Sequence, residues 1–259
     1  MDRASLRNLI SAAGLDARRD TILGHVLPGF ELRQVEGSPG LGATKLGGHP
    51  DLPAEQPWPV DGARTLCFVG QLDLAEFAGR PGAERWPSDG LLLCFEGIHM
   101  EPPLGRVVYV PAGASLARRA PPDGASMLPD DPEGFDMFCV YPEAAMALSE
   151  RLSLPPPWSA HCQALEKALG DDAFTLYWDE VWLPSVDTIE DDVHRALGYT
   201  TTQDDSDAHQ LGLTLVLEVA SDDALEMMWG DVGRLWFFVP DADLIAGRTD
   251  RATVGHTLT

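Results

Sequence analysis

The chain has 259 residues, 44% of them apolar, which is enough to build a buried core and argues against disorder. Its formal net charge is −23, and this acidity excludes the cationic face that binding a nucleic-acid backbone requires. The longest apolar run, residues 213–219, is too short for a membrane helix, and no apolar leader follows Met1. We therefore expect a cytoplasmic protein that binds neither a membrane nor a nucleic acid.

The first half of the chain predicts two short helices followed by strands. Within residues 3–27 apolar side chains recur at helical spacing, and glycine follows each helix. Short runs of β-forming residues then predict strands at 31–36, 65–73, 91–95 and 106–110. Four prolines predict an ordered loop, rather than a strand, at residues 49–59. Residues 111–134 are rich in Pro, Gly, Asp and Ala and predict a connector or a flexible loop.

The second half predicts a helical stretch between two groups of strands. A strand is expected at 135–141, and the prolines at 155–157 introduce three helices, at 158–169, 171–182 and 187–197. Beyond an acidic loop, β-forming runs predict strands at 213–219 and 234–239. A short helix at 241–246 and a last strand at 251–258 complete the expected order.

Two stretches of the chain repeat the same local pattern. In the segments from Trp86 to Phe95 and from Trp229 to Phe238, Trp stands four residues before Gly, Asp lies just before that Gly, and an apolar run ends in Phe. A strand of similar length precedes each segment. The pattern predicts an internal duplication with units at 45–95 and 197–238 inside one domain spanning residues 1–259, and a helical insert at 158–197. We expect a β-rich α+β fold, in which two similar antiparallel sheet units form a roll-like core, with helices at the N-terminus and in the middle.

Charge is distributed unevenly along the chain. Residues 1–119 hold 12 basic and 14 acidic residues, a net of −2, whereas residues 120–259 hold 6 and 27, a net of −21. Three interpretations stay open: a docking surface for a basic partner, mimicry of nucleic-acid charge, and solubility or adaptation to salt.

Signatures of catalysis and of cofactor binding are missing from the sequence. It contains no dinucleotide-binding glycine motif, no P-loop and no Gly-x-Ser-x-Gly nucleophile turn. The four cysteines lack metal-site spacing and stand beside apolar residues, which predicts buried free thiols. His49, Asp51 and Glu55 fall short of a convergent ligand set for a metal. We expect no catalytic residue, no metal and no cofactor.

Five residues form a candidate ligand site: Lys45, His49, Asp51, Trp229 and Asp231. Lys45 stands near a glycine-rich stretch, where its ammonium group could bind an anion or pair with a carboxylate such as Asp51. We favour the ion pair. A shared site further requires the 45–51 loop and the 229–231 turn to converge on one cleft.

The same stretches carry a resemblance to a known family. Residues 44–53 (Thr-Lys-Leu-Gly-Gly-His-Pro-Asp-Leu-Pro), 66–74, 89–93 and 228–238 resemble the YwqG-like family, a bacterial domain family of unknown function. The resemblance covers the chain from about residue 30 to its end, and it implies a β-rich roll with helices. Members commonly repeat a His-x-x-x-Gly-Tyr-Pro-Asp motif in the second half. Residues 194–201 of this chain read His-Arg-Ala-Leu-Gly-Tyr-Thr-Thr, which argues against a second site of that kind.

The function expected from the sequence is binding rather than catalysis. The acidic C-terminal half predicts an interaction with a basic protein, in the manner of an immunity-type partner. The alternative is a small-molecule-binding or hydrolytic enzyme with a site near the Lys45–Asp51 loop and the Trp229–Asp231 turn.

Overall fold

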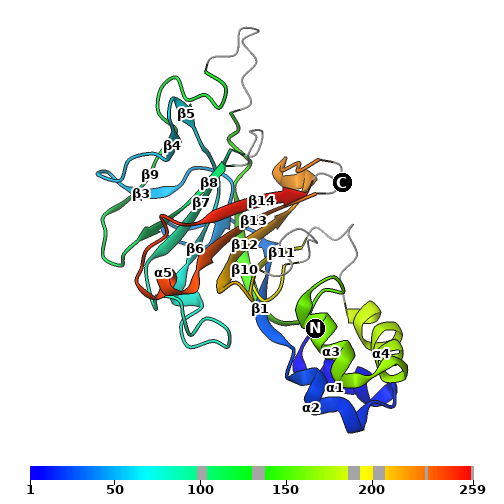
Figure 1. Ribbon diagram of the computed structural model, residues 1–259. Helices are drawn as coiled ribbons and strands as arrows, with labels where there is room; N and C mark the ends of the chain where they lie inside the picture. Colours follow the sequence, from blue (N-terminus) through cyan, green and yellow to red (C-terminus); the bar gives the residue numbers. More distant parts are fainter. Residues whose placement is uncertain (98–103, 130–137, 186–192, 201–207, 231–232, 258–259) are drawn as a thin grey trace.

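A single large antiparallel sheet organises the protein, as a computed structural model shows (Figure 1). The structure describes residues 1–97, 104–129, 138–185, 193–200, 208–230 and 233–257. The sheet contains ten strands: β1 (Leu27–Val35), β2 (Lys45–Leu46), β6 (Cys67–Asp73), β7 (Leu91–Gly97), β8 (Leu104–Val110), β10 (Ala144–Ser153), β11 (His194–Leu197), β12 (Leu213–Ala220), β13 (Arg234–Pro240) and β14 (Thr253–Thr257). Two small hairpin sheets stand beside it: β3 (Asp51–Pro53) with β9 (Leu116–Arg118), and β4 (Val60–Asp61) with β5 (Arg64–Thr65).

The large sheet curls until its two edges meet. Its strand order is β14-β13-β12-β11-β1-β10-β2-β6-β7-β8, so β8 and β14 are the edge strands. Gly105 of β8 lies so close to Val254 of β14 that a Cβ on the glycine would stand 2.7 Å from the Val254 Cβ. The sheet is therefore nearly closed into a barrel, and the expected β-rich α+β class is confirmed.

Strands such as β7 read as continuous apolar runs because both of their faces are buried. Leu92 and Cys94 point into the main core, while Leu93 and Phe95 pack on the other face against Trp58 and neighbouring apolar side chains. Alternation of polar and apolar residues disappears in such a strand, since neither face meets water.

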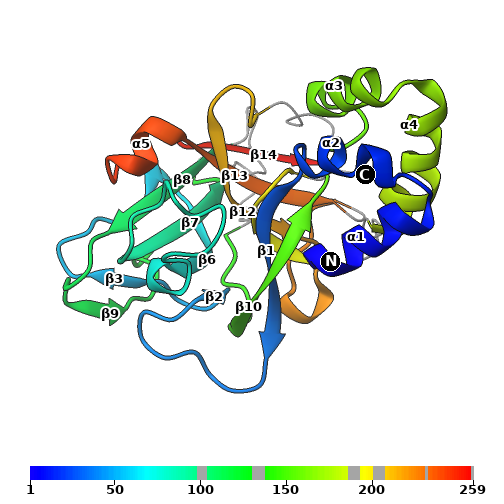
Figure 2. The ribbon, with the colours of Figure 1, turned by 90° about the horizontal axis from the view of Figure 1, so that it is seen from below.

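The helices gather into a separate lobe beside the sheet (Figures 1 and 2). This helical lobe contains α1 (Arg3–Ala12), α2 (Arg19–Leu23), α3 (Ala160–Leu169), α4 (Asp171–Tyr177) and a π-helical turn at Trp178–Trp182. It has its own apolar core, to which Leu6, Ile10, Leu165, Tyr177 and Val181 contribute. The sequence predictions for 3–27 and for the first two helices of the middle stretch are confirmed.

Short helices and single helical turns also occur between the other elements. The helix α5 (Asp241–Ile245) follows β13 as expected, and single 3-10 turns occur at Asp16–Arg18, Leu74–Glu76, Leu183–Ser185 and Asp223–Leu225.

The third helix expected in the middle stretch is wrong where the structure describes it. Residues 187–192 lie outside the described residues, and His194–Leu197 form the strand β11, which pairs with β1. All four residues of β11 are buried. The apolar spacing that suggested a helix equally fits a strand covered on both faces, and pairing with β1 decides between them. The helical insert therefore does not extend to residue 197.

Three further expectations about loops and strands need correction. The strand predicted at 135–141 is wrong over its described part: Pro142 lacks an N–H, and the paired strand begins only at Ala144, as β10. The proline-rich stretch 49–59 contains β3, and the connector 111–134 contains β9. These two short strands pair with each other, Asp51 opposite Arg118, although they are distant in sequence.

The strand order of the large sheet is symmetric about its centre. The long strands β1 and β10 pair with each other at the centre of the sheet. Along the chain, the sheet strands β2, β6, β7 and β8 follow β1, and the strands β11, β12, β13 and β14 follow β10. Each long strand also pairs with the other half, β1 with β11 and β10 with β2. Both β6 and β12 carry a bulge, after Phe68 and after Leu215 respectively. The internal duplication stays a prediction, with which this order agrees.

Candidate functional site

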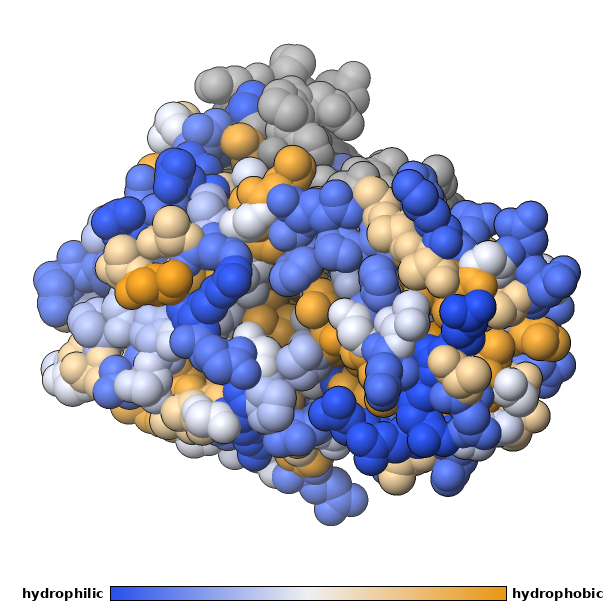
Figure 3. Space-filling model, turned by 60° about the horizontal axis from the view of Figure 1, so that its bottom comes forward, coloured by the Kyte–Doolittle hydropathy of each residue, from blue (hydrophilic) through white to orange (hydrophobic). Residues whose placement is uncertain are grey.

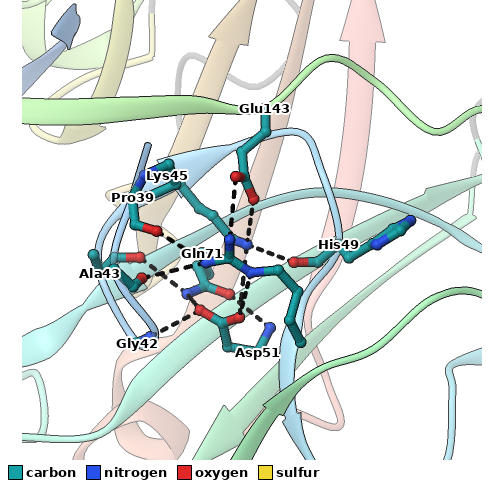
Figure 4. A network of polar contacts seen from close by, with 10 residues as sticks. Pro39, Gly42, Ala43, Lys45, His49, Asp51, Gln71 and Glu143 are labelled. Atoms are coloured by element: carbon teal, nitrogen blue, oxygen red, sulfur yellow. Dashed lines mark hydrogen bonds and ion pairs between the residues drawn. The ribbon is translucent and has the colours of Figure 1, made fainter. Parts of the chain in front are cut away.

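Lys45 is the centre of a buried polar network (Figure 4). It lies in β2, which is hydrogen-bonded between β10 and β6, and its side chain is fully buried. Its Nζ atom donates to the backbone carbonyl of His49 and, at 3.0 Å, to Glu143 Oε2, and it lies 3.7 Å from Asp51 Oδ1. These acceptors replace the hydrogen bonds to water that the ammonium group loses on burial.

Asp51 is fully buried and is held by donors from three separate segments. Its Oδ2 accepts from the Gly42 N–H and from Gln71 Nε2, both at 2.8 Å, and its Oδ1 accepts from Arg118 Nε at 3.1 Å. Burial acts to raise the pKa of this carboxyl, but these hydrogen bonds and the Lys45 charge outweigh it and hold the pKa below its ordinary value. Asp51 is therefore a carboxylate at neutral pH.

Four charges alternate in a closed cycle, which we call the charge ring: Lys45, Asp51, Arg118 and Glu143. Arg118 completes it by donating from Nη1 to Glu143 Oε1 at 3.2 Å. The same guanidinium also donates to the Pro39 carbonyl at 3.1 Å. Arg118 and Glu143 are partly exposed and form the outer rim, whereas Lys45 and Asp51 lie beneath them. The ring is formally neutral, and it ties together the loop 39–51, β9 and the start of β10.

The charge ring cross-links the segments that carry it. His49 contributes its backbone carbonyl, and its imidazole points away from the other groups in Figure 4. Each carboxylate faces two cations and each cation faces two carboxylates. Charges neutralised in this way fix the loops that carry them.

Trp229 lies near this network but does not enter it. It is buried, and its ring packs edge-on against Tyr141 with centroids 5.8 Å apart. The Tyr141 carbonyl in turn accepts the Gly48 N–H at 2.8 Å. The 45–51 loop and the Trp229 turn therefore contact the same short segment, and Tyr141 stands between them. Asp231 lies outside the described residues.

Sequence reasoning missed most of the partners in the interior. Arg118 and Glu143 complete the charge ring, and Gln71 donates to Asp51. Glu96 is fully buried, where it accepts a 2.9 Å hydrogen bond from the Tyr141 hydroxyl. Burial, followed by the nearby Glu96 charge, raises the Tyr141 pKa well above its ordinary value. One signal was available: an isolated polar residue inside an apolar strand, as at Gln71 or Glu96, indicates a buried group with a partner.

A second buried charge cluster occupies the equivalent place in the other half of the sheet. Glu218 of β12 is fully buried, accepts from Thr200 Oγ1 at 2.8 Å and lies 3.4 Å from Arg234 Nη1. Arg195 of β11 stands opposite Glu218 of β12 in the strand register. In the first half, Lys45 of β2 stands opposite Gln71 of β6 in the same way. Among the described contacts, the strand β12 supplies the carboxylate and Thr200 supplies a hydroxyl.

The helical lobe exposes a concentration of negative charge. Between residues 158 and 185 there are five carboxylates and one lysine. All five carboxylates lie on exposed residues: Glu166, Asp171, Asp172, Asp179 and Glu180. Figure 3 shows apolar atoms among hydrophilic ones on the lobe. A concentration of one charge sign on a surface attracts partners of the opposite sign.

Over the described part of the chain, His, Cys, Asp and Glu nowhere gather in threes that could hold a metal ion. None of the helices described combines the length and the apolar character needed to span a bilayer.

Comparison with known proteins gives a family but no activity. No curated protein matches this chain. The sequence model of one family, described as a domain of unknown function, matches residues 44–256, from the start of the charge ring to β14, and leaves α1 and α2 outside. Because the match covers most of the chain, the protein belongs to the family "Domain of unknown function (DUF1963)".

Proposed function

We propose that the protein is a non-catalytic binding protein whose acidic C-terminal half engages a basic protein partner. One observation carries this proposal: the net charge of −21 in residues 120–259 against −2 in residues 1–119. Complementary charge accelerates encounter and selects partners, even where it adds little affinity. An immunity-type pairing with a basic protein is the form we favour. A cytoplasmic location, a bacterial origin and a closer kinship with YwqG-like members belong to the same proposal.

The neutral, saturated charge ring supports a binding role over a catalytic one. Lys45 and Asp51 are fully buried and paired with each other and with their neighbours, so a substrate would have to displace those partners to reach them. The alternative, a small-molecule-binding or hydrolytic site between the 45–51 loop and the Trp229 turn, has less support because Tyr141 stands between the two.

Binding to purified basic proteins of different folds tests the proposal. The full chain is immobilised, and binding is measured at low and at high salt, with an acidic protein as a negative control. We expect salt-sensitive binding of at least one basic protein. Neutralising exposed carboxylates of the second half should abolish it: Glu166→Gln, Asp172→Asn, Asp223→Asn and Asp250→Asn. An equal set from the first half should leave it intact: Glu36→Gln, Glu55→Gln, Glu84→Gln and Asp89→Asn. The proposal fails if no basic protein binds at low salt, or if both sets weaken binding equally.

A further inference from the structure

The outer face of the helical lobe exposes two leucines seven residues apart. Leu176, at the end of α4, is 46% exposed, and Leu183, just after the π-helical turn, is 49% exposed. The opposite face of the same segment is buried in the lobe core through Tyr177 and Val181. The π-helical turn Trp178–Trp182 separates the two leucines, so one exposed apolar side chain stands on either side of this turn. Among the described residues, nothing covers the exposed half of either side chain.

Carboxylates stand close to both leucines along the chain. Asp172, Asp179 and Glu180 are exposed, and they stand four residues before, three after and four after Leu176. Asp172 lies one α-helical turn before Leu176, and Asp179 and Glu180 lie in the π-helical turn that follows it. Residues 168–185 contain no Lys or Arg, so no basic residue of the segment itself neutralises that face.

The segment that carries the face is held rigidly. The indoles of Trp178 and Trp182 stack with centroids 4.4 Å apart and planes 7° from parallel. Trp182 Nε1 also donates to the Pro155 carbonyl at 3.1 Å, which anchors the π-helical turn to the chain before α3. A surface ordered before binding loses less conformational entropy when a partner arrives.

We propose that Asp172, Leu176, Asp179, Glu180 and Leu183 form a docking face for a cationic amphipathic helix of the partner protein. This inference rests on the proposed function and names the face and the partner element. Aliphatic side chains one seven-residue repeat apart on the partner helix pack on the two leucines, and its lysines or arginines meet the carboxylates. Solubility would explain the exposed carboxylates but not the exposed leucines, because exposed apolar side chains lower the solubility of a protein.

A synthetic peptide tests this face on the full chain. The probe is a helical peptide with leucines seven residues apart on one side and lysines elsewhere, and its fluorescence anisotropy reports binding at low salt. We expect Leu176→Ser with Leu183→Ser to weaken binding by about tenfold or more, since both contacts are lost. Ile245→Ser, which alters an exposed aliphatic residue on α5, should leave binding unchanged.

The charge contribution has its own matched pair of variants. Asp172→Asn, Asp179→Asn and Glu180→Gln together should weaken binding and flatten its salt dependence, whereas Glu36→Gln, Glu55→Gln and Asp89→Asn, which neutralise exposed carboxylates of the first half, should change both little. A peptide of equal charge with serine in place of leucine should bind the wild type more weakly. If face and control variants behave alike, or if both peptides bind equally, the docking face is overturned while binding to a basic partner stands. If neither peptide binds at low salt, the docking face is overturned, and the separate test with basic proteins decides the proposed function.

Discussion

Asp51→Asn is the substitution that tests the charge ring most directly. The side chain keeps its shape but loses its charge, so Lys45 and Arg118 are left to share Glu143. The asparagine NH₂ group must also face at least one of the donors that now reach the carboxylate, such as the Gly42 N–H at 2.8 Å. Breaking a buried ion pair by removing one partner costs about 3–5 kcal/mol. Out of a total stability of about 5–15 kcal/mol, the loss is large.

Urea unfolding followed by tryptophan fluorescence and by circular dichroism measures this loss. The control is Asp16→Asn, because Asp16 pairs with Arg19 on the exposed surface, where a pair contributes less than about 1 kcal/mol. Adding Lys45→Met to Asp51→Asn removes one charge of each sign, so we expect the double variant to lose less stability than the two single losses added together. If Asp51→Asn changes the free energy of unfolding by no more than the control, the reasoning about the charge ring is refuted.

Three further predictions follow from named contacts. The pKa of Asp51 is lowered in the folded protein, so its contribution to folding stability is present above the unfolded pKa of about 3.9 and is lost as pH falls through the folded pKa. The free energy of unfolding should therefore fall less steeply with acid in Asp51→Asn than in wild type. Equal slopes of stability against pH would contradict this. Gly47→Ala places a Cβ 1.9 Å from the Pro142 carbonyl oxygen at a positive φ of 64°, so thermal unfolding should show a much larger loss than for Gly113→Ala, where φ is 81° and nothing lies within 4 Å. A thiol reagent should label half-buried Cys139 in the native protein but Cys94 only on unfolding, since burial seals Cys94 and raises its pKa; mass spectrometry of the labelled peptides checks the order.

Charged residues have different surroundings in the helical lobe and in the curled sheet. Inside the sheet, charges such as Lys45 and Glu218 are matched by partners from distant segments and hold the fold together. On the lobe, carboxylates such as Asp179 remain exposed and available to another molecule. Charges are thus matched inside the sheet and exposed on the lobe, where the proposed partner would dock.

Local sequence patterns were sufficient for much of the architecture. The helices of 3–27 and 158–182 and the strands at 213–219 and 234–239 follow from the period of their apolar residues, and each lies within a few residues of its predicted place. The expected pairing of Lys45 with Asp51 is also present, with the two groups 3.7 Å apart, although Glu143 lies closer to the ammonium group, at 3.0 Å.

The composition of the chain and the uneven distribution of its charge could also be read from the sequence. The residues that complete the charge ring could not. Glu143 lies 98 residues from Lys45, and Arg118 lies 67 residues from Asp51. The strands β10 and β11 have apolar spacing that fits a helix as well as a buried strand, and only pairing with β1 selects the strand. The sequence by itself determined the local period, the turns and the charge asymmetry, since these depend on neighbours a few residues away. The tertiary structure alone decided the charge ring and the central strands, because their stability comes from groups that meet only after the sheet has closed.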